Sequence, residues 1–282
     1  MFPNRFKENG VIGMTQSRRL LALLTAILTV AGCGSSTDDE PESQRSGAGV
    51  SRAATAPKSA VVDLCEDTRG TCKHLTNVDV DGDGTDDQVG ISYYADRPGP
   101  QVAFGTSHFT TIVAINGTRH TIEQSVDGSP YTEPAEIYRG AFLLSRAQGS
   151  DIALHLISGQ GAAEKFAVIS WDGSRLVALP QPPTANPNTL QQKGIWFLGS
   201  SHGKQGSVKC RQPGEIAMVD LTAATQEGMT VPGGGRREEN FYTFVGSKWQ
   251  PTGSDNTADA SFSYAWDVHK NAFDCKDQGT KP

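Results

Sequence analysis

The residues from Asp79 to Asp87 have the types and spacing of a calcium-binding loop. Counting Asp79 as position 1, aspartates stand at positions 1, 3, 5 and 9, and the carbonyl of Thr85 falls at position 7. Gly84, at position 6, permits the sharp turn that lets these oxygens converge. Carboxylates packed so closely repel one another unless a cation neutralises them. The spacing therefore predicts a Ca²⁺ site, and the alternative is a solvated acidic turn between two strands.

The sequence after this loop separates it from an EF-hand. An EF-hand needs a glutamate at position 12 and an exiting helix, but position 12 is Gly90, and residues 91–94 favour a strand. The loop and the following strand resemble the FG-GAP or VCBS-type repeats of integrin α-subunit propellers and of many secreted bacterial proteins. The resemblance covers about fifteen residues, and at Asp81 the family often has Asn. It implies that the side chains of Asp79, Asp81, Asp83 and Asp87 and the backbone of Thr85 bind the ion, with Asp86 at a non-ligand position.

A second pattern matches the Gly-x-Ser-x-Gly sequence around the nucleophile of serine hydrolases. It spans residues 199–203 and places Ser201 at the serine position. The nucleophile needs a helix directly after it, whereas residues 204–213 are rich in helix breakers. The helix breakers argue against catalysis. We keep an envelope hydrolase that uses Ser201, with calcium in a structural role, as the alternative function. The six histidines have no metal-site spacing, and His155, within an apolar strand, is expected to be a hydrogen-bonded core residue.

Four cysteines besides Cys33 are available for disulfide bonds. An even number in an exported chain predicts two bridges, for which three pairings are possible. We favour Cys65 with Cys72, which closes a local loop, and Cys210 with Cys275, which ties the C-terminal segment to the rest of the domain. Zinc is the alternative, but neither pair has Cys-x-x-Cys spacing.

The N-terminal residues 1–32 have the features of a lipoprotein signal peptide. Arg18 and Arg19 precede an apolar run over residues 20–31, which is too short to span a bilayer. The small residues before Cys33 resemble a bacterial lipobox. This resemblance implies cleavage before Cys33, lipid attachment to its sulfur, and retention at the outer face of the cytoplasmic membrane. A secreted signal with an incidental cysteine is the alternative, and translation could start at residue 1 or 14.

The composition changes again after Cys33. Residues 33–60 hold almost no large apolar side chain, so they are expected to form a flexible tether. The folded domain is then expected to span residues 61–282. The net charge is −6 and no basic cluster remains after the signal, which argues against nucleic acid as a partner.

The chain resembles itself when it is shifted by 64 residues, so that Asp87 falls on Asp151 and then on Glu215. Each of these acids opens an apolar strand, and a hairpin pattern follows over residues 115–119, 171–175 and 244–248. Asn-Gly and Asp-Gly are preferred hairpin turns. The later copies lack the carboxylates, so one metal site is expected. The repeats predict an all-β fold of three blade-like antiparallel repeats of about 64 residues, a partial or irregular β-propeller, with a β-sandwich as the alternative.

Three blades are too few for a closed ring, which normally takes 4 to 8, so the sheet edges must be covered. Residues 262–268 alternate between apolar and polar and are expected to form an edge-closing strand, together with residues 60–64. We interpret their aromatic stripe as core, with a ligand platform as the alternative. Residues 180–188 and 231–240 are Pro- or Gly-rich and are expected to be loops.

These observations predict a lipid-anchored protein of the bacterial envelope with a calcium-stabilised all-β module for non-catalytic binding or assembly. Its partners would be the membrane, through Cys33, and a protein or glycan ligand. The sequence does not identify that ligand or the oligomeric state.

Overall fold

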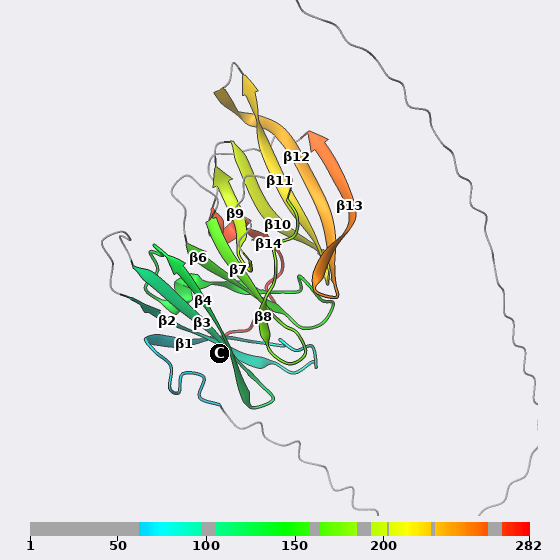
Figure 1. Ribbon diagram of the computed structural model, residues 1–282. Helices are drawn as coiled ribbons and strands as arrows, with labels where there is room; N and C mark the ends of the chain where they lie inside the picture. Colours follow the sequence, from blue (N-terminus) through cyan, green and yellow to red (C-terminus); the bar gives the residue numbers. More distant parts are fainter. Residues whose placement is uncertain are drawn as a thin grey trace, which may run out of the picture. The chain divides into compact units, whose positions relative to one another are not determined.

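A computed structural model describes residues 62–96, 105–157, 164–184, 193–201, 203–226, 229–258 and 267–282. The expected signal peptide (1–32), the tether (33–60) and its lipidation residue Cys33 lie outside the described residues. Strands make up most of the described chain, and its two helices, α1 (Pro134–Ile137) and α2 (Val268–Asn271), have four residues each. The predicted all-β class is confirmed (Figure 1).

The first four strands form an antiparallel meander in which each strand pairs with the next. They are β1 (Thr71–Val78), β2 (Asp87–Ala95), β3 (Thr106–Ile115) and β4 (Thr118–Asp127). Between β3 and β4, Asn116 and Gly117 have φ angles of 49° and 76°. A two-residue hairpin turn of this type requires positive φ at both positions, so the predicted Asn-Gly turn is confirmed.

The second sheet has ten strands. They are β5 (Tyr138–Phe142), β6 (Asp151–Ile157), β7 (Glu164–Trp171), β8 (Leu176–Ala178), β9 (Trp196–Ser201), β10 (Lys204–Gln212), β11 (Glu215–Gln226), β12 (Met229–Val245), β13 (Lys248–Ala258) and β14 (Phe273–Asp274). Strands β5–β8 and β10–β13 each form a meander, and β9 joins the two by pairing with β7 and β10. Only β14 pairs in parallel among the described strands, and none of their sheets closes into a barrel.

The hairpins of the second and third meanders lie where the sequence predicts them. Val245 pairs with Lys248 across a two-residue turn at residues 246–247. The turn between β7 and β8 is wider, because Trp171 pairs with Leu176. The turn residues of both hairpins, 172–175 and 246–247, are exposed.

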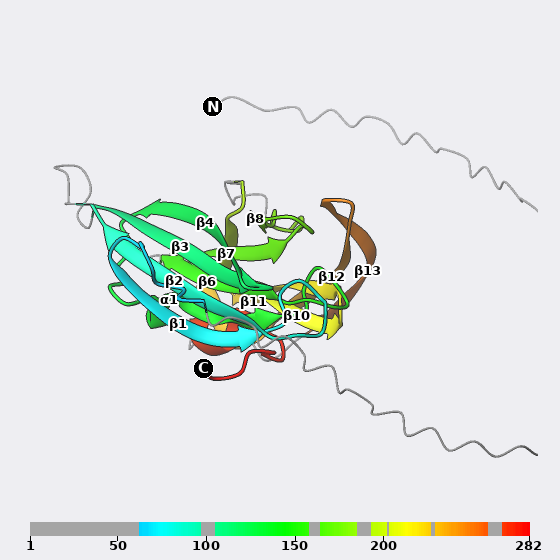
Figure 2. The same ribbon diagram turned by 90° about the horizontal axis from the view of Figure 1, so that it is seen from below.

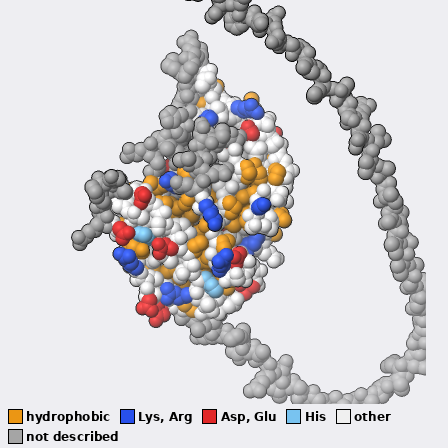
Figure 3. Space-filling model, viewed as in Figure 1, with side chains coloured by type: hydrophobic (Ala, Val, Ile, Leu, Met, Phe, Trp, Pro, Cys, Tyr) orange, Lys and Arg blue, Asp and Glu red, His pale blue; other side chains and the backbone are white. Residues whose placement is uncertain are grey.

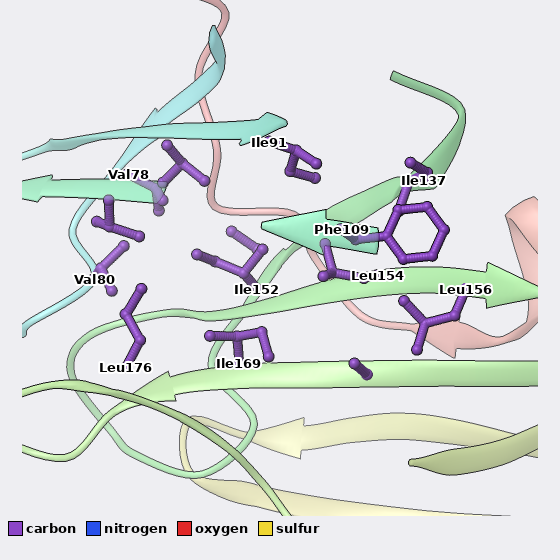
Figure 4. Packing of buried hydrophobic residues seen from close by; sticks show 14 of the residues in the cluster. Val78, Val80, Ile91, Phe109, Ile137, Ile152, Leu154, Leu156, Ile169 and Leu176 are labelled. Carbon is purple, nitrogen blue, oxygen red and sulfur yellow. The ribbon is translucent and has the colours of Figure 1, made fainter. Parts of the chain in front are cut away.

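Two apolar cores lie on opposite sides of β6 and β7. Core 1 joins these strands to β2 and β3 through buried side chains that include Ile91, Phe109, Ile152 and Ile169 (Figure 4). Core 2 joins them to β9–β12 through side chains that include Phe166, Trp196, Val208, Ile216 and Met218. Because both faces of β6 and β7 are buried, their sequences are nearly continuous apolar runs rather than alternating ones.

The C-terminal segment contacts the first strand of each meander. Ala272 accepts a hydrogen bond from the backbone N–H of Val208 in β10, Gln278 donates one to Ala141 in β5, and Thr280 pairs with Asn77 in β1. The chain end therefore lies beside β1, as both views show (Figures 1 and 2). The two disulfides, Cys65–Cys72 and Cys210–Cys275, are the predicted pairs, and the second fixes this segment to β10.

Two local predictions differ from the structure, and a third lies mostly outside the described residues. Residues 231–240 belong to the long strand β12, because backbone pairing with β11 and β13 overrides their glycine content. The predicted closing strand at 262–268 lies mostly outside the described residues, and its last residue, Val268, begins α2. The described part of 60–64 is also no strand, since Leu64 begins a turn. The edge strands β1 and β5 are instead contacted by Thr280 and Gln278.

Candidate metal centre

The predicted calcium loop, residues 79–86, connects β1 to β2 and is held at both ends by core 1. Val78 and Val89 are buried on the two strands, and Val80 is fully buried within the loop itself. The apolar anchors fix the ends of the loop, while its middle, residues 83–86, is exposed. Because the buried Val78 and Val80 alternate with Asp79 and Asp81, these two carboxylates are turned away from the core, whereas Asp87 is buried.

Backbone N–H groups organise the carboxylates. Asp79 accepts hydrogen bonds from Gly82, at 2.6 Å, and from Gly84, at 3.0 Å, through its two oxygens. Asp81 accepts one from the N–H of Asp83 at 3.0 Å, and Asp83 accepts one from the N–H of Thr85 at 2.7 Å. Gly82 and Gly84 have φ angles of 89° and 86°, which few other residues adopt. The glycines are therefore needed for the turns that gather these side chains.

Three of the four predicted carboxylates converge. One oxygen from each of Asp79, Asp81 and Asp87 can be chosen so that all three lie within 4.8 Å of one another. Asp83 is exposed and is not in this group, and Thr85 lies beside it on the exposed part of the loop. The arrangement offers hard oxygen ligands on a short loop, which suits Ca²⁺ better than a metal that prefers nitrogen or sulfur.

Asp87 is the electrostatic centre of the group. Burial, together with the charges of Asp81 and Asp83, raises the pKa of its carboxyl to about 6, against the opposing effect of a hydrogen bond from the N–H of Val80 at 2.9 Å. A buried carboxylate beside like charges is costly unless a cation compensates it. The donor set therefore fits a bound divalent cation.

The loop between β5 and β6, residues 143–150, lies against the predicted calcium loop. Ser150 donates its backbone N–H to the carbonyl of Asp79 at 2.8 Å, and Arg146 donates from Nη2 to the carbonyl of Val80 at 2.8 Å. A hollow of about 440 Å³ between the loops is lined by Asp79, Asp83 and Gln148, among others. Sequence reasoning missed Arg146 and Ser150, because only the tertiary structure brings them to the loop.

The second meander has a hydroxyl where the first has a carboxylate. Ser145 stands 64 residues after Asp81, and it donates both its N–H, at 2.7 Å, and its hydroxyl, at 2.9 Å, to the carboxylate of Asp151. Asp151 is fully buried, and this burial raises its pKa. The second loop therefore satisfies its buried acid with protein donors and lacks the carboxylate cluster of the first.

The third meander has no comparable loop. Only residues 213–214 separate β10 from β11, and Glu215 pairs with Arg211 at 3.1 Å. Among the described residues, the carboxylate cluster of the first meander is the single group of this kind, and the prediction of one metal site stays a prediction.

The alternative nucleophile, Ser201, is the last residue of β9. Its backbone pairs with Lys204 at the start of β10, so a strand rather than a helix follows the Gly-x-Ser-x-Gly pattern. His202 lies outside the described residues. His155 is fully buried, as expected of a core histidine, with Nδ1 at 2.5 Å from the hydroxyl of Tyr131 and Nε2 at 2.6 Å from Glu164.

Neither helix in the described part of the chain has the length and apolar character needed to cross a bilayer. Comparison of the chain with protein-family models, curated proteins and solved structures finds no match.

Proposed function

We propose that this chain is a lipid-anchored protein of the bacterial envelope whose all-β domain binds Ca²⁺ and serves as a non-catalytic binding or assembly module. The observation that carries the metal proposal is the convergence of Asp79, Asp81 and Asp87. The carboxylate of Asp87 is buried beside the negative charges of Asp81 and Asp83. Asp83 and Thr85 would complete the site from the exposed side of the loop. The anchoring proposal rests on the sequence up to Cys33.

We further propose that the three meanders are blade-like repeats of the FG-GAP or VCBS type. Their second strands, β2, β6 and β11, begin at Asp87, Asp151 and Glu215, which are spaced by 64 residues. The contact between successive loops also recurs with this spacing. Asp79 accepts a hydrogen bond from Ser150, and Leu143 accepts one from Gly214. These recurrences support an internal repeat in which only the first copy keeps the metal ligands.

Calcium would act in this domain by stabilising it. An ion that binds only the native state adds RT ln(1 + [L]/Kd), which is about 2.7 kcal/mol at a hundredfold excess over Kd. The loop that binds it also contacts residues 143–150, so ordering of the first loop would extend to the second meander. A non-catalytic role is supported by the strand that follows Ser201, since a nucleophile at that position needs a helix.

The metal proposal is tested by calcium titration of the purified protein and of two variants. Wild type should show heat of binding and a higher melting temperature with calcium. Asp87→Asn should lose most of both effects, because it removes a charged ligand from the centre of the group. Asp86→Asn is the matched control, because Asp86 is exposed and outside the carboxylate group, and it should behave as wild type. A wild-type protein without a calcium-dependent melting shift, or an Asp87→Asn variant that keeps it, contradicts the proposal.

A further inference from the structure

A pocket lies between the hairpin of β7 and β8 and the hairpin of β12 and β13. Its volume is about 770 Å³, within the range typical of small-molecule sites. Most residues between 170 and 180, from the second meander, line the pocket. The third meander contributes Phe244 and residues 246–247, and the predicted calcium loop contributes Asp81. The pocket therefore touches all three meanders and shares one residue with the metal centre.

Part of the pocket lining is apolar. Trp171 and Phe244 are half-buried aromatic residues at the two hairpins, packed against core 1 and core 2 respectively. Val177 and Leu179 extend the apolar surface along and beyond β8. Rigid aromatic and aliphatic side chains of this kind can pack against an apolar face of a ligand and lose little conformational entropy on binding.

The lining also carries charges of both signs. Asp81 and Asp172 supply carboxylates, and Arg146 and Arg175 supply guanidinium groups. Two acids and two bases cancel, so the lining favours a ligand without strong net charge. Charges of both signs are also interspersed with hydrophobic side chains over the described part of the face in Figure 3.

Arg146 has hydrogen-bonding capacity that the described protein does not use. Its Nη2 donates to the carbonyl of Val80, but its Nε is buried and has no hydrogen-bond partner among the described residues. A buried donor without a partner costs stability and calls for an acceptor. Two further lining residues, Ser145 and Ser170, have hydroxyls 3.4 Å apart, and the hydroxyl of Ser145 donates to the buried carboxylate of Asp151.

We propose that this pocket binds a neutral pyranose unit of a saccharide chain, an inference that rests on the proposed role as a binding module. A pyranose has an apolar C–H face and a rim of hydroxyls that both donate and accept hydrogen bonds. The aromatic residues of the lining match the face, and its carboxylates and guanidinium groups, of which Asp172 and Arg175 form an ion pair at 3.3 Å, match the rim. Since Asp81 belongs to both sites, saccharide binding is expected to weaken when calcium is removed.

The test uses the full-length chain in detergent, with saturation-transfer NMR on neutral hexose and N-acetylhexosamine tetrasaccharides. At least one of them should receive magnetisation from the wild-type protein in the presence of calcium. Arg175→Ala should weaken binding about tenfold, the effect of losing one hydrogen bond to a charged group. Val177→Trp should abolish binding because its larger side chain projects from the apolar lining and obstructs the ligand. Lys248→Ala is the matched control, since Lys248 is an exposed residue of the third hairpin that does not line the pocket.

The outcomes separate this inference from the metal proposal. If no saccharide binds while calcium still raises the melting temperature, the saccharide site is wrong and the metal site stands. Equal binding by Val177→Trp, with an unchanged melting temperature, places the saccharide elsewhere and also overturns the inference. If a mixture of neutral peptides binds in place of the saccharides, the pocket is a peptide site.

Discussion

The carbonyl of Asp79 accepts a hydrogen bond from the backbone N–H of Ser150 at 2.8 Å, across 71 positions of sequence. Asp79 is also a member of the carboxylate group, so a proposed metal ligand is bonded directly to the loop of the next meander. Anything that orders the first loop is therefore expected to order the second as well.

Hydrogen exchange measures this coupling. Calcium should slow exchange of the N–H groups of Gly82 and Gly84, which donate to Asp79, and also that of Ser150 in the neighbouring loop. The reason is that local opening must break contacts that the bound ion holds in place. In Asp87→Asn the protection should disappear at all three positions. Protection confined to the first loop would show that the two loops are energetically independent.

The second loop provides a contrasting prediction. Ser145→Ala removes a hydroxyl donor from the buried carboxylate of Asp151, which should destabilise the protein by about 1–3 kcal/mol. Because this loop lacks the carboxylate cluster, the loss should be the same with and without calcium. Urea unfolding of the variant in both conditions checks it. A loss seen only in calcium would mean that Ser145 belongs to the metal site.

Local chemistry explains which features were predictable from the sequence. The turn at Asn116 depends on two adjacent residues that tolerate positive φ, and the convergence of Asp79, Asp81 and Asp87 depends on nine consecutive residues. The strand β12 was missed because its glycines and proline favour a loop by composition, while pairing with two neighbouring strands decides the outcome. The contact of Arg146 with Val80, and the short β14 pairing, exist only through long-range packing and leave no local pattern.

His108 gives the first sheet a pH dependence. Burial opposes its charged form, but hydrogen bonds with Asp96, at 2.9 Å, and Glu123, at 3.1 Å, outweigh it, so the pKa of His108 is raised above 6.5. Its imidazole also stacks on Tyr94, with ring centroids 4.4 Å apart. A raised pKa of this kind contributes stability that is fully present below pH 6.5 and is lost as the pH rises through the folded-state value.

The matched variant for this effect is His108→Gln, which keeps hydrogen-bonding capacity but cannot be protonated. The difference in unfolding free energy between wild type and variant should shrink as the pH rises from 5 through neutrality. Chemical denaturation across this range, in constant calcium, measures the difference. A constant difference would show that protonated His108 is not stabilising.

Lipid attachment is tested at Cys33, which lies outside the described residues. Cys33→Ser should abolish incorporation of labelled fatty acid and release the protein from the membrane fraction, because the polar tether offers no apolar segment to hold a bilayer. Fractionation with and without detergent distinguishes the two forms. A variant that still requires detergent for extraction would contradict the lipobox interpretation.

The last prediction concerns the disulfide between Cys210 and Cys275, which are separated by 65 residues. Chain entropy gives about 4 kcal/mol of stabilisation for a loop of this length, and about 2 kcal/mol for the shorter loop between Cys65 and Cys72. Replacing both Cys210 and Cys275 with Ser should therefore cost more than the same change at Cys65 and Cys72. The C-terminal segment should also become cleavable before the sheets unfold, because the packing of Phe273 against core 2 and the hydrogen bonds to β10, Ala141 and Asn77 are then its remaining attachments and none is covalent. Limited proteolysis followed by mass spectrometry identifies the first cut, and an early cut elsewhere, with the C-terminal segment intact, would show that the strand contacts alone fix the chain end.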